Sequence, residues 1–470
     1  MKELIINERD NVAVMLEGEL SGHKRALRDI KAGEDIIKYG YKIGHATEDI
    51  KEGEHVHTHN IKTNLSGTLE YKYERTGYEL KDQPKRTFMG YVRENGSVGI
   101  RNEIWIVNTV GCVNKTSELL AREANKLYGD KCDGVFNFVH PFGCSQLGDD
   151  QATTQAILKG MVNHPNAAGV LVLGLGCENN NIGVFKPLLG EVNEKRVKFM
   201  STQEFDDEVA EGLRLIGELV EYAQSFKREE CDLSKLVVGL KCGGSDGFSG
   251  LTANPLIGRV SDKLIASGGS TILTEVPEMF GAETILMNRA TDEATFEKVV
   301  DLINNFKEYF MRHNQVVYEN PSPGNKKGGI TTLEDKSLGC VQKSGSADVV
   351  DVIQIGEHIE KQGLNLLTGP GNDIVAVTNL TASGCHMVLF STGRGTPVGA
   401  PVPTVKIATN NSLAQRKPHW IDFNAGPIIE GADLSDELLD YIISVANGEK
   451  TNNEKNGYRE ISIFKDGVTL

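Results

Sequence analysis

Thiol, imidazole and carboxylate side chains follow several apolar segments of this chain. Each segment ends in a short stretch rich in glycine and cysteine, such as Gly-Cys-Val-Asn after residues 103–107 and Lys-Cys-Gly-Gly after residues 236–240. Such groups held together would suit an iron or zinc ion, and carboxylates beside them could move protons. The residues in this position are Cys112, His140, Cys144, Cys177, Glu178, Cys242, Asp246, Glu275 and Glu278.

A second polar cluster surrounds the apolar run 387–390. Arg394 stands between two glycines, so its guanidinium is placed as a fork for a carboxylate. Tight turns around a buried strand are the simpler explanation, although turns rarely need so many donors. We predict that the substrate is bound by Arg394, Asn372 and Thr392, with a second carboxylate partner among Arg93, Arg101 and Lys241.

Three histidines alternate with other residues in the segment Glu-His-Val-His-Thr-His-Asn. If this segment is a strand, His55, His57 and His59 share one face, where they could bind a metal ion or act in catalysis. A solvated polar strand face is the alternative. We predict catalytic roles for His57, His59, Asp246, Glu275 and Arg394, and the candidate metal ligands are Cys112, His140, Cys144, Cys177, Cys242, Glu278 and His386.

Apolar strands and amphipathic helices alternate from residue 103 onward. Continuous apolar runs indicate strands buried on both faces, and their alternation with helices indicates parallel βαβ units in a doubly wound sheet. Ligands bind beyond the carboxyl ends of such strands, so the residues above would line one edge if all strands share one sheet. The predicted helices are Lys115–Tyr128, Asp150–Val162, Asp206–Phe226, Pro255–Ser267, Asp292–Met311 and Ser435–Val445.

Composition excludes several classes of protein. The formal net charge of -15 and the lack of a basic run argue against nucleic-acid binding. The sequence has no Walker A motif and no convincing dinucleotide fingerprint, so a doubly wound sheet does not imply NAD. Without a signal peptide or an apolar run of about 18 residues, we expect no membrane association. We therefore expect a cytoplasmic protein whose eight cysteines, none in a C-x-x-C pair, stay reduced.

Several long motifs resemble one known family. The segments FMGYVRENGSVGIRNEIWIVNTVGCVN, KCGGSDGFSGLTANPLIG, TEVPEMFGAE and GLNLLTGPGND…ASGCHMVLFSTGRGTPVGAPVPTVK are similar to the altronate/galactarate dehydratase family, in the same order along the chain. The resemblance implies an N-terminal β-clip (SAF-like) domain over residues 1–72 and a linker over 73–100. It also implies a middle, dimer-forming domain over 101–235 and a Rossmann-like catalytic domain over 236–470.

The resemblance also implies a reaction. Members of the family are metal-dependent hydro-lyases that need Fe²⁺, so we expect Fe²⁺, with an iron–sulfur cluster or Mn²⁺ as alternatives. The motif wording EHVHTHN and GYVRENG is nearest to members that convert D-altronate to 2-keto-3-deoxy-D-gluconate. Galactarate dehydration and a sulfolactate sulfo-lyase-like reaction are the alternatives, and a non-catalytic sugar-acid sensor is a more remote one. The expected partners are a small sugar acid and a second copy of the chain.

Overall fold

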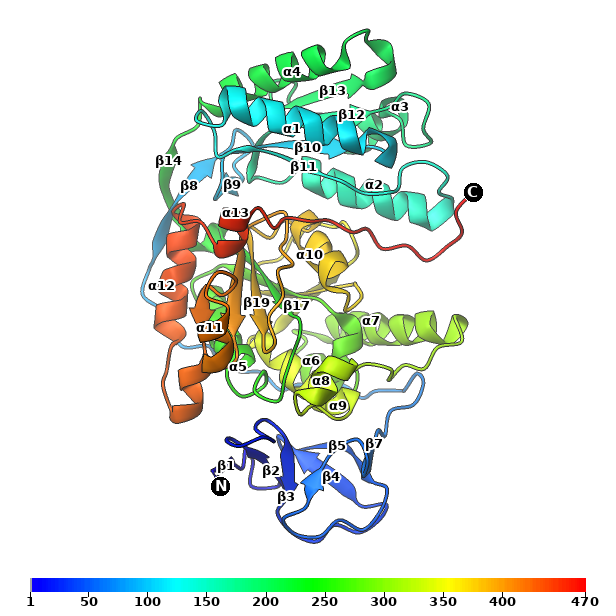
Figure 1. Cartoon of the computed structure of the whole chain (residues 1–470), viewed down its shortest axis with the longest axis vertical. Coiled ribbons are helices and arrows are strands. Elements are labelled where there is room, and N and C mark those ends of the chain that lie inside the picture. Colours follow the sequence, from blue (N-terminus) through cyan, green and yellow to red (C-terminus); the bar gives the residue numbers. More distant parts are fainter. Residues whose placement is uncertain (1) are drawn as a thin grey trace.

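Three units follow one another along the long axis of the molecule (Figure 1). The structure, a computed structural model, describes residues 2–470. A small β unit lies at one end, a large parallel sheet with helices lies in the middle, and a smaller α/β unit lies at the other end. Among the described residues, none of the helices is long and apolar enough to cross a membrane.

The N-terminal unit, expected to be a β-clip, consists of two antiparallel sheets. One sheet has the order β1-β2-β3-β6 and the other β4-β5-β7. Ile36, Ile43 and Ile61 are among its buried apolar residues. The strands are Glu3–Leu4 (β1), Val12–Met15 (β2), Lys24–Ala26 (β3), Asp35–Lys38 (β4), Tyr41–Ala46 (β5), His55–Val56 (β6) and Ile61–Lys62 (β7).

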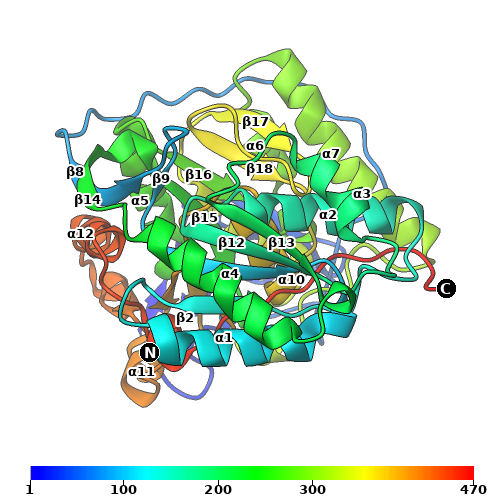
Figure 2. The ribbon, with the colours of Figure 1, turned by 90° about the horizontal axis from the view of Figure 1, so that it is seen from above.

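A segment without helix or strand connects this unit to the rest of the chain. It wraps along the large central unit, where it forms the blue trace at the margin of Figure 2. The Tyr71 hydroxyl donates to Glu283 at 2.6 Å, and the Tyr73 hydroxyl donates to the Ala290 carbonyl at 2.6 Å. These contacts hold the segment against the central unit. It ends at a small antiparallel sheet of β14 (Arg228–Asp232), β8 (Thr87–Val92) and β9 (Val98–Gly99).

The middle stretch of the sequence forms a four-stranded parallel sheet, ordered β11-β10-β12-β13. Two contacting helices, α1 and α4, cover its outer face in Figure 2. On the other face α2 contacts α10 of the central unit, and a Cβ at Gly160 would lie 2.3 Å from the Ala382 carbonyl oxygen, so only glycine permits this approach. The elements are Glu103–Asn108 (β10), Asn114–Tyr128 (α1), Val135–Phe138 (β11), Gly148–Val162 (α2), Ala167–Gly174 (β12), Ile182–Phe185 (α3), Val197–Ser201 (β13) and Glu208–Ala223 (α4).

The central unit is built on a seven-stranded parallel sheet ordered β17-β18-β16-β15-β19-β20-β21. Because β15 comes first in sequence and later strands are added on both sides of it, the crevice beside its carboxyl end is where an open α/β sheet binds ligands. The strands are Val237–Cys242 (β15), Ser270–Leu273 (β16), Val349–Ile353 (β17), Leu364–Leu367 (β18), Met387–Thr392 (β19), Thr404–Ala408 (β20) and Phe423–Asn424 (β21).

Helices cover both faces of this sheet, which confirms the doubly wound α/β class. The six predicted helices all form, and none of their ends is shifted by more than three residues. The prediction that all the candidate residues line one edge of one sheet is wrong, because the parallel strands are divided between two sheets. The helices are Ala253–Ala266 (α5), Glu283–Met287 (α6), Glu293–Arg312 (α7), Pro323–Lys327 (α8), Leu333–Cys340 (α9), Asp373–Ala382 (α10), Asn411–Arg416 (α11), Ser435–Ala446 (α12) and Asn452–Asn456 (α13).

A buried ion triad joins the β-clip to the central unit. Lys24 and Lys38 from the β-clip both bind the carboxylate of Asp335 in α9, at 2.8 Å and 2.9 Å. Burial alone would raise the pKa of Asp335, but the two ammonium groups hold it well below its usual range. An ionised, paired carboxylate therefore contributes stability above its unfolded pKa, and this stability is lost only as pH falls through its depressed folded pKa.

We expect the Asp335→Asn variant to dock its β-clip weakly, because two buried ammonium groups lose their counter-charge. Removing one partner from a buried ion pair costs about 3–5 kcal/mol. Urea unfolding of the two proteins at neutral pH measures this difference. The exposed pair Lys31–Asp49 in the same unit provides the control, since an exposed ion pair contributes little and Asp49→Asn should unfold at nearly the same urea concentration as the wild type. Equal losses in both variants would contradict the account.

Candidate active site

Two cysteines and a glutamate meet at the carboxyl end of the central sheet. Cys242 ends β15, Glu278 lies in the 3₁₀ turn Val276–Met279 after β16, and Cys340 ends α9. The two sulfur atoms are 3.4 Å apart, and the Glu278 Oε2 atom lies 3.3 Å from Cys242 Sγ and 3.2 Å from Cys340 Sγ. All three side chains are buried, with 1%, 5% and 4% of each residue exposed.

Three lysines surround this group and neutralise it. Lys343 donates to Cys242 Sγ at 2.8 Å and pairs with Glu275 at 3.2 Å. Lys336 pairs with Glu278 at 2.8 Å. Burial alone would raise the pKa of Glu278, but the nearby ammonium groups, Lys336 foremost, lower it to about 2. The group is therefore a buried network of alternating charges, which we call the thiol–carboxylate cluster: Lys241, Cys242, Glu275, Glu278, Lys336, Cys340, Lys343 and Asp373.

The backbone at two positions, Glu275 and Gly243, brings the side chains of this cluster together. Glu275 has φ 70°, a left-handed conformation that few non-glycine residues adopt. This turn follows β16 directly, and the Glu275 carboxylate accepts a hydrogen bond from the Cys242 backbone N–H at 3.1 Å. At Gly243 a Cβ would lie 2.7 Å from the Asp373 carboxylate and from the Phe390 ring. Only glycine there lets β15 end against the amino end of α10.

The donor set of the cluster fits a divalent transition metal. One ligand atom from each of Cys242, Glu278 and Cys340 lies within 4.8 Å of the others. Ligands about 2.1–2.3 Å from one ion lie about 3.1–3.8 Å apart at octahedral or tetrahedral angles, and the three separations here are 3.2–3.4 Å. Three ammonium groups balance the three carboxylates of the cluster, so two thiolates and one dication would leave it neutral. Thiolate and carboxylate ligands together suit iron or zinc.

A polar cavity of about 550 Å³ lies between the β-clip and the carboxyl ends of β15, β19 and β20. None of the cluster residues lines it, but Asp246 lines both this cavity and a small neighbouring pocket that Lys336 and Cys340 of the cluster also line. The exposed Arg394 lines the cavity together with Lys327, Arg416 and Glu430. Asp246 accepts hydrogen bonds from the Thr409 hydroxyl at 3.0 Å and from the Phe248 N–H at 3.1 Å. Burial raises the pKa of Asp246, although these donors oppose the shift. The cavity therefore offers three cationic groups, the protonatable carboxyl of Asp246 and the carboxyl of Glu430.

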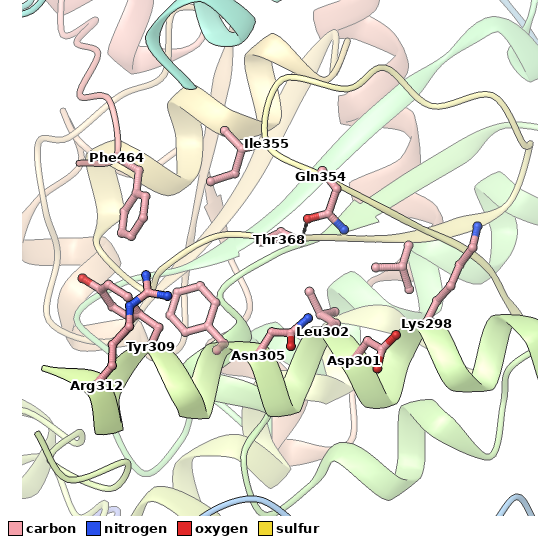
Figure 3. Close-up of a pocket in the computed structure, with 12 residues that line it drawn as sticks. Lys298, Asp301, Leu302, Asn305, Tyr309, Arg312, Gln354, Ile355, Thr368 and Phe464 are labelled. Carbon is pink, nitrogen blue, oxygen red and sulfur yellow. Dashed lines mark hydrogen bonds between the residues drawn. The ribbon is translucent and has the colours of Figure 1, made fainter. Parts of the chain in front are cut away.

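A second cavity, of about 480 Å³, lies at the outer edge of the sheet (Figure 3). It is lined mainly by α7 and by residues that follow β17 and β18, with Leu302, Tyr309 and Phe464 as its apolar wall. It shares no lining residue with the small pocket that Asp246 forms with Lys336 and Cys340. Its walls offer no grouped acid, base and thiol, so we do not assign the chemistry to it.

The β-clip contributes a histidine group. His55 and His57 have stacked rings with centroids 5.2 Å apart, and His23, which directly precedes β3, joins them, with its Nδ1 atom 3.1 Å from His55 Nε2. Burial, with smaller effects of neighbouring positive groups, lowers the pKa of His55 and of His57 to about 4. His59 is exposed, because the chain turns after β6 instead of continuing as a strand. Neither His57 nor His59 lines the cavity that holds Asp246 and Arg394.

Several predicted ligands lie elsewhere. Cys112, Cys144 and Cys177 are exposed on the smaller sheet, and among residues 2–470 they join no group with metal-ligand spacing. His140 bonds to the Asn108 carbonyl and the Phe142 N–H, while His386 bonds to the Val98 carbonyl and the Val237 N–H. Both rings therefore have no nitrogen left for a metal ion. Among the described residues, no three cysteines come together, which leaves an iron–sulfur cluster without its usual ligands.

Two of the predicted substrate arginines are structural. Arg93 is buried and donates to the Pro165 and Arg101 carbonyls and to the Asn102 side chain. Arg101 donates from Nε to Glu454 at 2.8 Å, and its other two nitrogens donate to backbone carbonyls and to the same carboxylate. Neither lines the Asp246 cavity. Of the other predicted binding residues, Lys241 belongs to the thiol–carboxylate cluster and Arg394 lines the Asp246 cavity. Asn372 caps α10, and the Thr392 hydroxyl accepts a hydrogen bond from the Gly395 N–H.

Sequence reasoning missed four residues of these groups: Cys340, Lys336, Lys343 and His23. The first three lie on α9 or just after it, with no strand before them, so the strand-end rule could not find them. The spacing of residues within α9 offered a weak signal, because Lys336 and Cys340 are four residues apart and therefore share one helix face. His23 follows a turn in the β-clip and carries no motif.

Comparisons with known proteins agree over nearly the whole chain. Family models described as Altronate/galactarate dehydratase SAF domain, D-galactarate dehydratase/Altronate hydrolase second domain, and D-galactarate/Altronate dehydratase C-terminal match residues 20–64, 90–224 and 233–469. Altronate dehydratase of Bacillus subtilis (strain 168) is 57% identical over 96% of this chain and 92% of its own.

Two further relatives come from Escherichia coli (strain K12). Its altronate dehydratase is 55% identical over 98% of this chain and 94% of its own length. Its galactarate dehydratase (L-threo-forming) is 33% identical over 93% and 87%. Family models over all three units and relatives of this identity settle the family. The chain belongs to the altronate/galactarate dehydratase family.

Proposed function

We propose that this chain is a metal-dependent hydro-lyase that converts D-altronate to 2-keto-3-deoxy-D-gluconate. The observation that carries this proposal is the thiol–carboxylate cluster together with a cavity lined by three cationic side chains. Its two relatives above 50% identity are both named altronate dehydratase, whereas the galactarate relative shares 33%. Dehydration removes the proton at C2, next to the carboxylate, and the hydroxyl at C3, and the enol product then tautomerises to the 2-keto acid.

We infer that the metal is Fe²⁺ and that Cys242, Glu278 and Cys340 hold it. A bound Fe²⁺ would act there as a Lewis acid on substrate oxygen atoms and stabilise charge that develops next to the carboxylate. The Cys242 contact with Cys340, together with burial, raises the pKa of the Cys340 thiol well above its usual range. Metal binding must therefore displace this proton. Lys343, at 2.8 Å from Cys242 Sγ, compensates the charge that appears on sulfur.

Two buried carboxyl groups supply acid and base. Burial raises the pKa of Glu275, with Lys241 and Lys343 opposing the shift, and burial likewise raises the pKa of Asp246. A raised carboxyl pKa brings proton exchange closer to the working pH, where general acid–base catalysis is most effective. We assign the two proton movements to this pair, with Glu275 in the cluster and Asp246 in the cavity wall.

The cavity binds the anionic end of the substrate in this account. Arg394 is exposed to it, and its backbone N–H is fixed by the Gly244 carbonyl at 3.0 Å. A guanidinium can hold a carboxylate through two parallel hydrogen bonds. Lys327 and Arg416 add positive charge at the same cavity, against a chain whose formal net charge is -15. A negatively charged sugar acid is thus attracted locally although the whole protein repels it.

We further infer a homodimer formed through the smaller sheet, working in the cytoplasm where the eight free thiols stay reduced. Exposed apolar side chains collect at the carboxyl ends of β11, β12 and β13, namely Val139, Leu147, Val184, Leu188 and Phe205.

Size-exclusion chromatography with light scattering is expected to give twice the mass of one chain. The double variant Val184→Glu and Leu188→Glu should give a single chain mass, and an unchanged dimer would move the interface elsewhere.

Loss of a thiolate should remove the catalytic metal. The proteins are loaded anaerobically with Fe²⁺ and desalted. We expect Cys242→Ser and Cys340→Ser to lose the iron ion held by the thiol–carboxylate cluster, because one of its three ligands is gone. Turnover should fall by about 10²-fold or more. Iron content by mass spectrometry and product formation are measured on the same samples. Cys231→Ser is the matched control, as Cys231 is buried in β14, which belongs to a different sheet from β15. Full iron content in both variants would refute this ligand set.

A substrate panel tests the reaction and the carboxylate site together. With Fe²⁺ the wild-type protein should dehydrate D-altronate far better than galactarate or sulfolactate. Arg394→Met should lower kcat/KM for altronate by about 10–100-fold, mainly through KM, because a hydrogen bond to a charged group is worth about 1.5–3 kcal/mol. Arg312→Met, in the outer-edge cavity, is the control and should leave both constants unchanged. Preference for galactarate, or no effect at Arg394, would contradict the proposal.

A further inference from the structure

The proposed dehydration makes no use of the histidine group, which lies where the β-clip meets α8. His23 is buried, and His55 and His57 are half-buried. One ring nitrogen from each of the three lies within 4.8 Å of the others. The group shares no residue with the thiol–carboxylate cluster, and its ligands are nitrogen only. It is therefore a second constellation with its own chemistry.

The nitrogen spacing in this group matches metal coordination. Imidazole nitrogens bind zinc and similar ions at about 2.0–2.1 Å, so two such nitrogens lie about 2.9–3.4 Å apart at octahedral or tetrahedral angles. His23 Nδ1 and His55 Nε2 are 3.1 Å apart. The three rings also approach one another closely, with centroid separations of 4.9–5.2 Å. Three imidazoles this close, without an acidic partner among them, are typical of a transition-metal site.

Hydrogen bonding orients the rings as a metal site requires. The Lys327 carbonyl can only accept, so His23 must donate to it from Nε2, at 3.2 Å, and the Nδ1 lone pair faces His55 Nε2 inside the group. A ligating histidine commonly donates its other N–H to a backbone carbonyl in this way. Within residues 2–470, His57 Nδ1 is buried and has no hydrogen-bond partner. A buried polar nitrogen without a partner is costly unless something binds it.

The local charge opposes a cation. Lys24 follows His23 directly, and its ammonium group binds the Asp335 carboxylate at 2.8 Å and the Gly329 carbonyl at 2.7 Å. Because Lys38 binds the same carboxylate, the ion triad keeps one net positive charge, and Lys24 contributes, after burial, to the lowered pKa of His55 and His57. Neutral imidazole is nevertheless a strong ligand for transition-metal ions, so coordination by three rings offsets this repulsion.

We propose that His23, His55 and His57 bind a divalent first-row transition-metal ion, separate from the ion at the thiol–carboxylate cluster, and that this ion fastens the β-clip onto α8. The connection continues inward from α8. Asn325 in this helix donates to the Ser245 carbonyl at 2.8 Å and lies 3.3 Å from the Lys336 ammonium. Lys327 and Gly328 at its end line the Asp246 cavity. The ion would therefore stabilise one wall of that cavity through α8.

Cobalt substitution tests this site independently of turnover. Full-length protein is stripped of metal by a chelator under anaerobic conditions, loaded with excess Co²⁺ and desalted, and cobalt per chain is measured by mass spectrometry. We expect two ions in the wild type and one in His23→Gln. The ion that remains in His23→Gln should be bound at the thiol–carboxylate cluster, so this variant should keep the thiolate-to-cobalt charge-transfer absorption. Cys242→Ser should also bind one ion and lose this absorption. His45→Gln is the matched control, since His45 lies in the other β-clip sheet, and should bind two.

A second variant and a second measurement protect the test from misfolding. His57→Gln removes a ring whose buried Nδ1 makes no hydrogen bond, so it should fold with a wild-type circular dichroism spectrum and still lose one ion. Its affinity at this site should fall by more than the roughly 10–100-fold typical of losing an outer-shell contact. Hydrogen exchange over residues 323–329 should slow on Co²⁺ binding in the wild type and in His45→Gln, but not in His23→Gln or His57→Gln. Two ions in both histidine variants, or one thiolate-bound ion in the wild type, would overturn the proposal.

Discussion

The structure depends on the compensation of charge between three buried ammonium groups and the carboxylates beside them. An isolated ion in a protein core is strongly unfavourable, and a buried pair is tolerated only with close contacts and additional hydrogen bonds. Lys241, Lys336 and Lys343 each bind a carboxylate in this way at the carboxyl end of the central sheet. Only because these charges cancel can two thiols and a glutamate approach within 3.4 Å inside the protein. The proposed metal site therefore rests on an electrostatic balance rather than on any single residue.

The fold supplies this balance from separate parts of the chain. Parallel strands bring Lys241, Cys242 and Glu275 to one edge, and the left-handed turn at Glu275 directs Glu278 toward the sulfurs. Helix α9 adds Lys336 and Cys340 from the other side, and its first turn holds Asp335, which binds the β-clip. One helix thus contributes to the thiol–carboxylate cluster and fixes the β-clip, which forms part of the cavity wall. A change at the β-clip can reach the cluster through this helix and through α8.

Sequence patterns predicted the periodic part of the structure well. The six amphipathic helices and the apolar strands follow from hydrophobic periodicity and formed within a few residues of expectation. Cys242, Glu275 and Glu278 were found because they end strands that share a sheet. The same rule placed Cys112, Cys144 and Cys177 with them, but sheet membership is decided by long-range packing, and these three belong to the smaller sheet. Cys340, Lys343 and His23 could not be predicted, since tertiary contacts alone bring them to their groups.

The central claim is that Cys242, Glu278 and Cys340 hold the iron used in dehydration. Crystals grown anaerobically with Fe²⁺, with diffraction recorded on both sides of the iron absorption edge, locate every iron atom directly. The account predicts an anomalous peak within bonding distance of both sulfur atoms and of Glu278. A protein that turns over altronate, yet shows iron only at the β-clip histidines or at neither group, would contradict it.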